Sequence, residues 1–213
     1  SVENMYFNTF LYNSVYNGAS QNAVNGSLDV MSAISAMVAF SAATAVITTF
    51  FAGTLSDKTG KRKWFISIGY ILWGIVTASF GLISRDNTAV LFGLTDEVKI
   101  LTATVCIVII MDCVMTFMGS TGNDAAFNAW VTDVTNSKNR ATVESVLALM
   151  PLLATAVVMG LAGAVTGIGY SVFFLALGAI VTVCGVLGCF TLKDKKIEPD
   201  RKTAYFQNLI YGF

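Results

Sequence analysis

Long apolar runs separated by short charged segments set the pattern of this chain. Residues 31–53 carry no charged side chain, and neither do residues 64–83. A helix needs about 20 mainly apolar residues to cross the roughly 30 Å hydrocarbon core of a bilayer. The pattern therefore predicts an all-α membrane protein in which residues 1–192 form a bundle of six transmembrane helices. The predicted spans cover residues 5–24, 31–53, 64–83, 100–131, 141–166 and 170–192.

The first of these spans is the most polar, because asparagines alternate with its aromatic residues. Such a helix crosses a membrane only with its amide face turned to protein or to a water-filled cavity. If it crosses, we expect Asn8 and Asn13 to line a solute path. An amphipathic helix that lies in the membrane interface is the alternative.

Small residues recur at helix-packing intervals, as at Gly178 and Gly185 in the last span. In lipid, small residues let helix backbones approach closely and so favour association. We therefore expect a close helix–helix contact there, with a structural role.

The composition supports a membrane protein and disfavours several functions. Charged residues make up only 12% of the chain, against about 25% in an ordinary soluble domain. There is no histidine, and the four cysteines lie inside apolar runs without the spacing of zinc ligands. These absences disfavour an enzyme embedded in the membrane, and we expect no metal or other cofactor. The balance of 13 basic and 13 acidic residues shows no bias towards nucleic acid.

The basic residues predict how the chain is oriented. Eleven of the 13 lie in residues 54–63, in residues 132–140 or from residue 193 onward. Six spans place these three segments on one side of the membrane. Because positively charged loops stay in the cytoplasm, we expect a multi-pass protein of the cell (inner) membrane with both termini cytoplasmic. Residues 193–213 would then form the cytoplasmic start of a central linker.

Two acidic residues in the span 100–131 are informative, because a charge inside the bilayer is costly. Asp124 precedes Asn128 by one helical turn, so the two share a face. Asp112 begins a second polar or small stripe that ends at Asn123. One interpretation is a hydrated path in which Asp124 binds solute or carries a proton. The alternatives are a helix-end acid at Asp124 and a structural partner across the bundle at Asp112.

The segment between the second and third spans has the order Gly-x-Leu-x-Asp-(basic)-x-Gly-(basic)-(basic) over residues 53–62. It resembles the loop between helices 2 and 3 of the major facilitator superfamily, where this loop helps to hold the cytoplasmic side closed. The resemblance implies that Gly53 allows close helix approach and that Asp57 pairs with a cation. Gly60 would supply a turn that a side chain would disfavour. A merely basic turn is the alternative. The other residues of this cytoplasmic gate would be Lys61, Arg62 and Arg140, the last as a candidate partner for Asp57.

A second segment, residues 123–135, is similar to the helix 4 region of glycoside–pentoside–hexuronide:cation symporters. Asp124 falls where melibiose-type carriers place an acid used in sugar and cation binding, and Trp130 would offer an aromatic ring near the site. Those carriers also have a pair of acids on helix 2, where this chain has Ala45 and Thr49. Sodium coupling is therefore disfavoured, whereas proton coupling or transport without an ion stays open.

These resemblances imply one half of a transporter. A carrier of the superfamily pairs two six-helix halves, so we expect this chain to be the amino-terminal half of such a fold. Its expected partners are a small-molecule solute, the lipid bilayer and a second six-helix half, with pairing between two copies of the chain as the alternative. The expected function is secondary active transport of a sugar or glycoside by alternating access. A non-transporting membrane scaffold or sensor is the competing function.

Overall fold

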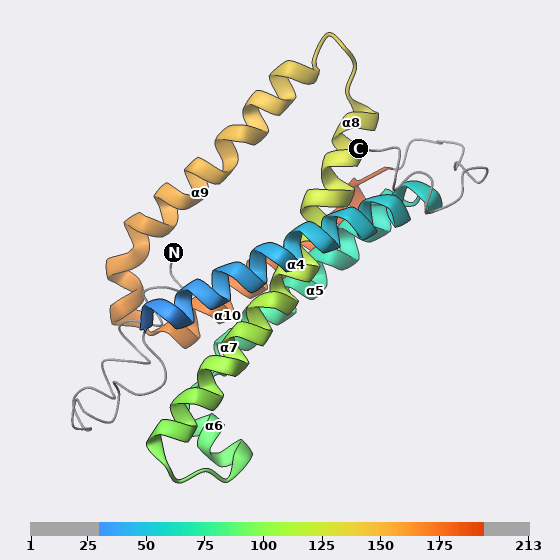
Figure 1. Ribbon diagram of the computed structural model, residues 1–213. Coiled ribbons are helices and arrows are strands. Elements are labelled where there is room, and N and C mark those ends of the chain that lie inside the picture. Colours follow the sequence, from blue (N-terminus) through green and yellow to red (C-terminus); the bar gives the residue numbers. More distant parts are fainter. Residues whose placement is uncertain (1–29, 194–213) are drawn as a thin grey trace.

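The computed structural model describes the backbone of residues 30–193 and the side chains of residues 33–160 and 167–193 (Figure 1). Every regular element in this part of the chain is a helix, and five helical segments are long and apolar enough to cross a membrane. The predicted span 5–24, with Asn8 and Asn13, lies outside the described residues, as does the predicted linker beyond its first residue. The elements are α4 (Val30–Thr59), α5 (Arg62–Phe80), α6 (Arg85–Phe92), α7 (Glu97–Gly119), η2 (Ser120–Phe127), α8 (Asn128–Val134), α9 (Arg140–Ile168) and α10 (Tyr170–Thr191).

Helix α4 continues past the predicted span 31–53 and ends at Thr59. The charged segment expected as a loop is therefore mostly helical, and only Gly60 and Lys61 separate α4 from α5. The hydroxyl of Thr59 donates to the carbonyl of Leu55 at 3.0 Å, which adds a side-chain bond to the last turn. An apolar run marks the length of helix that lies in lipid, whereas the backbone hydrogen bonds continue into the polar region beyond it.

The predicted span 100–131 corresponds to one helical rod, Glu97–Val134, which is built from α7, η2 and α8. Asp96 caps its start by accepting a hydrogen bond from the N–H of Val98 at 3.0 Å. The stretch Ser120–Phe127 within this rod is a π-helix. Such wider turns are rare and occur frequently at functional sites.

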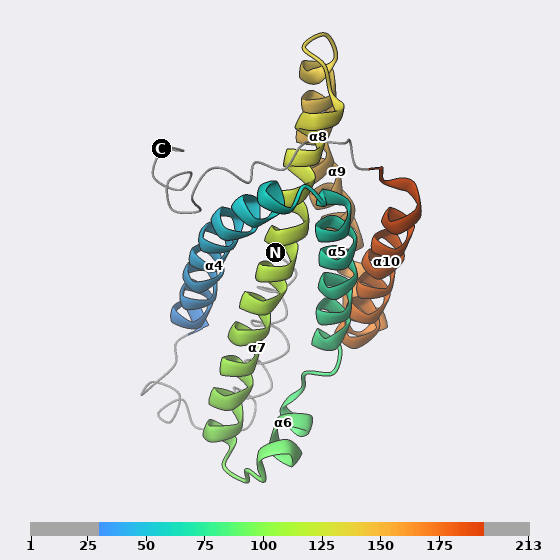
Figure 2. The same ribbon diagram turned by 90° about the vertical axis from the view of Figure 1, so that its right-hand side faces the viewer.

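Helices α5 and α10 form the most extensive helix pair of the described residues and lie side by side in Figure 2. Glycines allow their backbones to approach closely. A Cβ atom added at Gly178 would lie 2.5 Å from the nitrogen of Ala78, and one at Gly185 would lie 2.7 Å from the nitrogen of Ile71. The close contact expected at these two glycines is confirmed.

A buried apolar cluster joins four helices near the end of α5. The rings of Phe80 in α5 and Phe174 in α10 stack with their centroids 5.5 Å apart. Leu101 and Val105 of α7 and Met37 of α4 complete the cluster. This cluster and the α5–α10 contact hold α4, α5, α7 and α10 as one bundle.

Helix α9 stands apart from this bundle over most of its length (Figure 1). None of the side chains of Arg140–Gly160 is buried, and its main contact with the described residues is α10. Large apolar residues such as Leu152 and Met159 are exposed along it. The helix is therefore apolar and left largely uncovered by the described residues.

Candidate functional site

An ion-pair cluster joins three helices where α4 turns into α5. One nitrogen of the Arg62 guanidinium lies 2.8 Å from a carboxylate oxygen of Asp57, and the other lies 3.1 Å from an oxygen of Asp133 in α8. The side chains of Arg62 and Asp133 are mostly buried, whereas that of Asp57 is 61% exposed. The planar fork of arginine suits two carboxylates at once, and lysine could not reproduce this geometry. Arg62 therefore ties the end of α4 and the start of α5 to α8.

The turn between α4 and α5 depends on Gly60. Its φ is 62°, in the left-handed region where a side chain is disfavoured, as the sequence predicts. Its N–H binds the carbonyl of Ser56 at 3.0 Å and closes the last turn of α4. The reversal within two residues brings Asp57 and Arg62 together, and it leaves the side chain of Lys61 exposed.

One expectation for this region is wrong, and a second is not met among the described residues. Arg140 does not pair with Asp57: it donates to the carbonyl of Thr132 at 2.8 Å and bonds the hydroxyl of Thr135, so it secures the turn between α8 and α9. Arg62, much closer in sequence, takes the place beside Asp57. Gly53 makes no close helix approach, because a Cβ atom added there would meet nothing within 4 Å among the described residues.

A second polar group lies on the π-helical stretch. The hydroxyl of Tyr70 on α5 donates to the side-chain oxygen of Asn123 at 2.9 Å. The amide nitrogen of Asn123 in turn donates to a carboxylate oxygen of Asp124 at 3.0 Å. Asn128 donates to the backbone carbonyl of Asp124 at 3.1 Å, and both side chains are exposed. Asp124 and Asn128 are therefore neighbours on one exposed face.

Close packing under this polar group explains its position. A Cβ atom added at Gly69 would lie 2.8 Å from the Cα of Gly122, so α5 and η2 touch through their backbones. One turn away, the ring of Trp73 packs over Gly119. Asn123 is therefore fixed on the α5 side, and Asp124 is left on the exposed side.

Asp112 lies apart from this group, at the contact between α7 and α4. Its side chain is buried, and its carboxyl lies beside the hydroxyl of Ser41. That hydroxyl also forms a 2.6 Å hydrogen bond with the hydroxyl of Thr116, one turn after Asp112. In the described structure Asp112 thus has a structural partner across the bundle, one of the two roles considered for it.

Trp130 lies near the end of α10. Its indole nitrogen donates to the carbonyl of Lys193 at 3.1 Å, and its ring stacks on Phe127 with centroids 6.0 Å apart. The ring therefore joins α8 to Lys193, two residues after the end of α10. Contact between this ring and a solute stays a prediction.

Sequence reasoning missed several members of these groups. Asp133 is part of the segment compared with symporters, but its pairing with Arg62 depends on the register of α8 against α5. Tyr70 and Ser41 lie inside apolar runs, and only the fold brings them to Asn123 and Thr116. The π-helical stretch has one sequence signal, which is the cluster of small and polar residues from Ser120 to Ala126.

The arrangement suits hydrogen bonding and proton transfer more than metal chemistry. Asp124 offers an exposed carboxylate, and Asn128 offers an amide on the same face. In the part of the chain described, no three His, Cys, Asp or Glu side chains cluster as a metal site. The polar face can therefore accept hydrogen bonds from hydroxyl groups, hold a cation at one carboxylate or take up a proton.

Comparison with known proteins gives one finding. A family model described as Major Facilitator Superfamily matches residues 4–209 of the chain, which is nearly its whole length. No curated protein and no solved structure matches it. The family match confirms the resemblance that was drawn from residues 53–62. Together with the five membrane-length helices, it confirms the predicted all-α membrane fold.

Proposed function

The chain belongs to the major facilitator superfamily of multi-pass membrane transporters, and we propose that it moves a small polar solute by alternating access. The observation that carries this proposal is the exposed pair Asp124, on the π-helical stretch, and Asn128, at the start of α8, on one membrane-length helical rod. An acid exposed on such a helix needs water, a solute or a partner protein beside it, because lipid would not solvate it.

A sugar or glycoside is the proposed solute. The Asp124 carboxylate accepts hydrogen bonds from hydroxyl groups, and the Asn128 amide offers both a donor and an acceptor. Among the described residues, the second carboxylate oxygen of Asp124 has no hydrogen-bond partner. The similarity of residues 123–135 to glycoside–pentoside–hexuronide:cation symporters supports the same class. We further propose that Asp124 carries a proton, because helix 2 lacks the acid pair of the melibiose-type carriers.

The Arg62 cluster is proposed as the gate on the side of Gly60. In the described state it locks α4 and α5 to α8 through Asp57 and Asp133. Opening that side requires α8 to separate from the α4–α5 turn, which breaks at least one ion pair. A few kcal/mol separate the two states of a typical switching protein, so two ion pairs are enough to bias the equilibrium.

A second six-helix unit is proposed to complete the solute path. The exposed apolar face of α9 is left uncovered by the described residues over Arg140–Gly160 and would pack against that unit. The unit would be the carboxyl-terminal half of the same protein, with a second copy of this chain as the less favoured choice. We propose that the whole assembly lies in the cell membrane with the Gly60 side in the cytoplasm, following the basic residues of that side.

Uptake by cells that express the protein tests the proposal. The probes are a radiolabelled glycoside, a pentose and a hexuronide, each measured with and without a proton gradient. We expect uptake of one class to depend on the gradient. Asp124→Asn should lose at least about a hundredfold of the gradient-driven uptake, as expected when a positioned proton carrier is removed. Asp86→Asn, which removes an exposed acid in α6, is the matched control and should leave uptake unchanged.

The outcomes separate the competing functions. Unchanged uptake by Asp124→Asn at equal expression would remove Asp124 from the mechanism. Uptake that ignores the gradient in the unsubstituted protein would contradict proton coupling but not transport. No uptake of any probe, from a protein that reaches the membrane, would favour the scaffold or sensor.

A further inference from the structure

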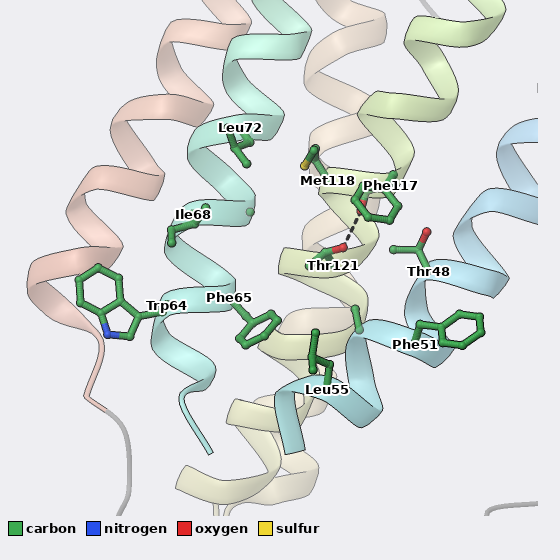
Figure 3. Close-up of a pocket in the computed structure, with 12 residues that line it drawn as sticks. Thr48, Phe51, Leu55, Trp64, Phe65, Ile68, Leu72, Phe117, Met118 and Thr121 are labelled. Carbon is green, nitrogen blue, oxygen red and sulfur yellow. Dashed lines mark hydrogen bonds between the residues drawn. The ribbon is translucent and has the colours of Figure 1, made fainter. Parts of the chain in front are cut away.

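An apolar groove lies between α4 and α5, with residues of α7 and Thr121 of η2 between them (Figure 3). Its volume is about 470 Å³, within the roughly 300–1,000 Å³ of ordinary ligand sites. Its floor is the junction of α7 and η2, where Gly69 touches Gly122. Because α4 and α5 both pack on that floor but touch each other little, the groove stays open between them.

The lining excludes a polar solute. Aromatic and aliphatic side chains such as Phe51, Leu55, Phe65 and Ile68 make up most of the wall. Thr121 contributes a hydroxyl, but this group donates to the carbonyl of Phe117 at 2.8 Å and is satisfied within its own helix, as the dashed line in Figure 3 shows. Thr48 adds one further hydroxyl to the lining, so the occupant must be apolar over most of its length.

The groove opens on the outer face of the helices rather than into the bundle. Phe51 and Ile68 are about half exposed, at 50% and 48%. From Trp64 to Leu72 the groove follows α5 over nine residues, a rise of about 12 Å at 1.5 Å per residue. This length is close to the hydrocarbon of one leaflet, about 15 Å. Both observations fit a lipid acyl chain that enters from the bilayer.

Positive charge gathers at one end of the groove. The groove ends at Leu55 and Trp64, on either side of the turn that carries Lys61. Lys61 is exposed and forms no ion pair with any described residue, whereas Arg62 is already neutralised by two acids. The ammonium of Lys63 lies 6.0 Å from the ring centre of Trp64, a pairing typical of the membrane–water interface. A phosphate group at this end would meet a cation.

We propose that this groove binds one phospholipid of the leaflet on the Gly60 side, with an acyl chain along α5 and an anionic headgroup at Lys61. The lipid fills the space between α4 and α5 and steadies the turn that positions Arg62. The site is separate from Asp124 and Asn128, so it would operate whatever solute the transporter moves.

Native mass spectrometry of the whole chain in detergent tests this site. The protein is titrated with phosphatidylglycerol or with phosphatidylcholine of the same acyl chains. We expect one retained molecule of the anionic lipid, held about fivefold more tightly than the zwitterionic one, as one lysine near an anionic surface would give. Equal retention of both lipids, or retention of neither, would overturn the proposal.

Two variants with matched controls locate the lipid. Ile68→Trp fills the groove and should lower retention of both lipids by about tenfold or more, since the acyl chain supplies most of the affinity. Ile75→Trp is the matched control: it changes the same residue type at similar exposure outside the groove, and it should leave the retention of both lipids unchanged. Lys61→Gln should remove only the preference for the anionic lipid. Its control, Lys99→Gln, should keep that preference.

If Ile68→Trp does not fold, Leu72→Trp takes its place as the groove variant. Retention by the folded groove variant at the level of the unsubstituted chain would contradict an acyl chain in the groove.

Discussion

The α5–α10 pair and the rod Glu97–Val134 are both membrane-length helices, yet they are held in different ways. Between α5 and α10 the contact is backbone against backbone, through Gly178 and Gly185. The rod also touches α5 through the backbone, at Gly69 and Gly122, but it adds side-chain hydrogen bonds to its neighbours at Thr116 and at Asn123, and part of it is π-helical. One region is held by close backbone contact, and the other combines such contact with polar side-chain bonds and an irregular stretch of helix.

This difference indicates which part of the bundle moves. A close backbone contact in lipid has no adjustable side chain in it, so it shifts only as a whole. Hydrogen bonds between hydroxyls and amides can break and re-form at a cost of about 1 kcal/mol each. We infer that α5 and α10 form the fixed frame. The rod, which carries Asp124 and ends at Asp133 beside the gate, is the element that changes position.

The largest effect should come from breaking the frame. Gly178→Val places atoms where only 2.5 Å separates the new Cβ from the nitrogen of Ala78. Overpacking of this kind costs about 1–3 kcal/mol, and more where backbone must move. Thermal unfolding in detergent, followed by far-UV circular dichroism, should show a clear loss of stability. Gly160→Val, where a Cβ meets nothing within 4 Å, is the control and should stay within about 0.5 kcal/mol. Equal melting of the two variants would contradict a close-packed frame.

The gate should show the next largest effect. Asp133→Asn leaves Arg62 without its more buried partner and should cost about 1–2 kcal/mol of stability, between the values of exposed and buried pairs. Asp57→Asn removes a partner that is 61% exposed and should cost less than about 1 kcal/mol. Both variants should shift the transporter towards the state that is open on the Gly60 side.

Accessibility of that side to a thiol reagent, together with denaturant unfolding, measures both parts of the gate prediction. A larger loss of stability for Asp57→Asn than for Asp133→Asn would show that the ion pair with α8 is not the one that closes the gate.

A smaller effect is expected where the rod meets α5 at the polar group. Tyr70→Phe deletes the hydroxyl that donates to Asn123 and should cost about 1 kcal/mol. Because Asn123 also orients Asp124, solute affinity should fall more than stability does. Radiolabelled solute binding beside a melting curve separates the two. A loss of stability without any change in binding would place Tyr70 in packing alone.

The smallest effect should appear at Gly53, where the superfamily resemblance implied a close helix contact. Gly53→Ala adds a methyl group to open space and should change stability by at most about 1 kcal/mol, in the stabilising direction, since alanine favours helix. A melting curve checks this. A loss of stability as large as that of Gly178→Val would show that Gly53 does make a close helix contact.

Much of the fold is predictable from the sequence. Apolar length places the four predicted spans 64–83, 100–131, 141–166 and 170–192 within a few residues of the observed helices, because lipid demands such runs. Gly60 is predictable because few other residues adopt a positive φ. The end of α4 is not, because the hydrogen bonds of a helix continue after its apolar run stops.

The sites are less predictable, because their members come from different helices. Arg140 looked like the partner of Asp57 by charge, but Arg62 reaches it through a two-residue turn. Nothing in the order of residues shows that Asp133 faces α5, since that depends on the rotation of α8. Asp112 and Asp124 look alike in sequence, yet one is buried against α4 and the other is exposed.

Cysteine labelling along the rod tests the central claim most directly. In a chain without its four native cysteines, Asp124→Cys and Ile110→Cys each place a thiol at a position that is exposed on the same rod. A membrane-impermeant, charged thiol reagent reaches thiols in water but not thiols in lipid. If the π-helical face lines a water-filled solute path, position 124 is labelled quickly and position 110 is protected. Equal protection of both positions would contradict the account.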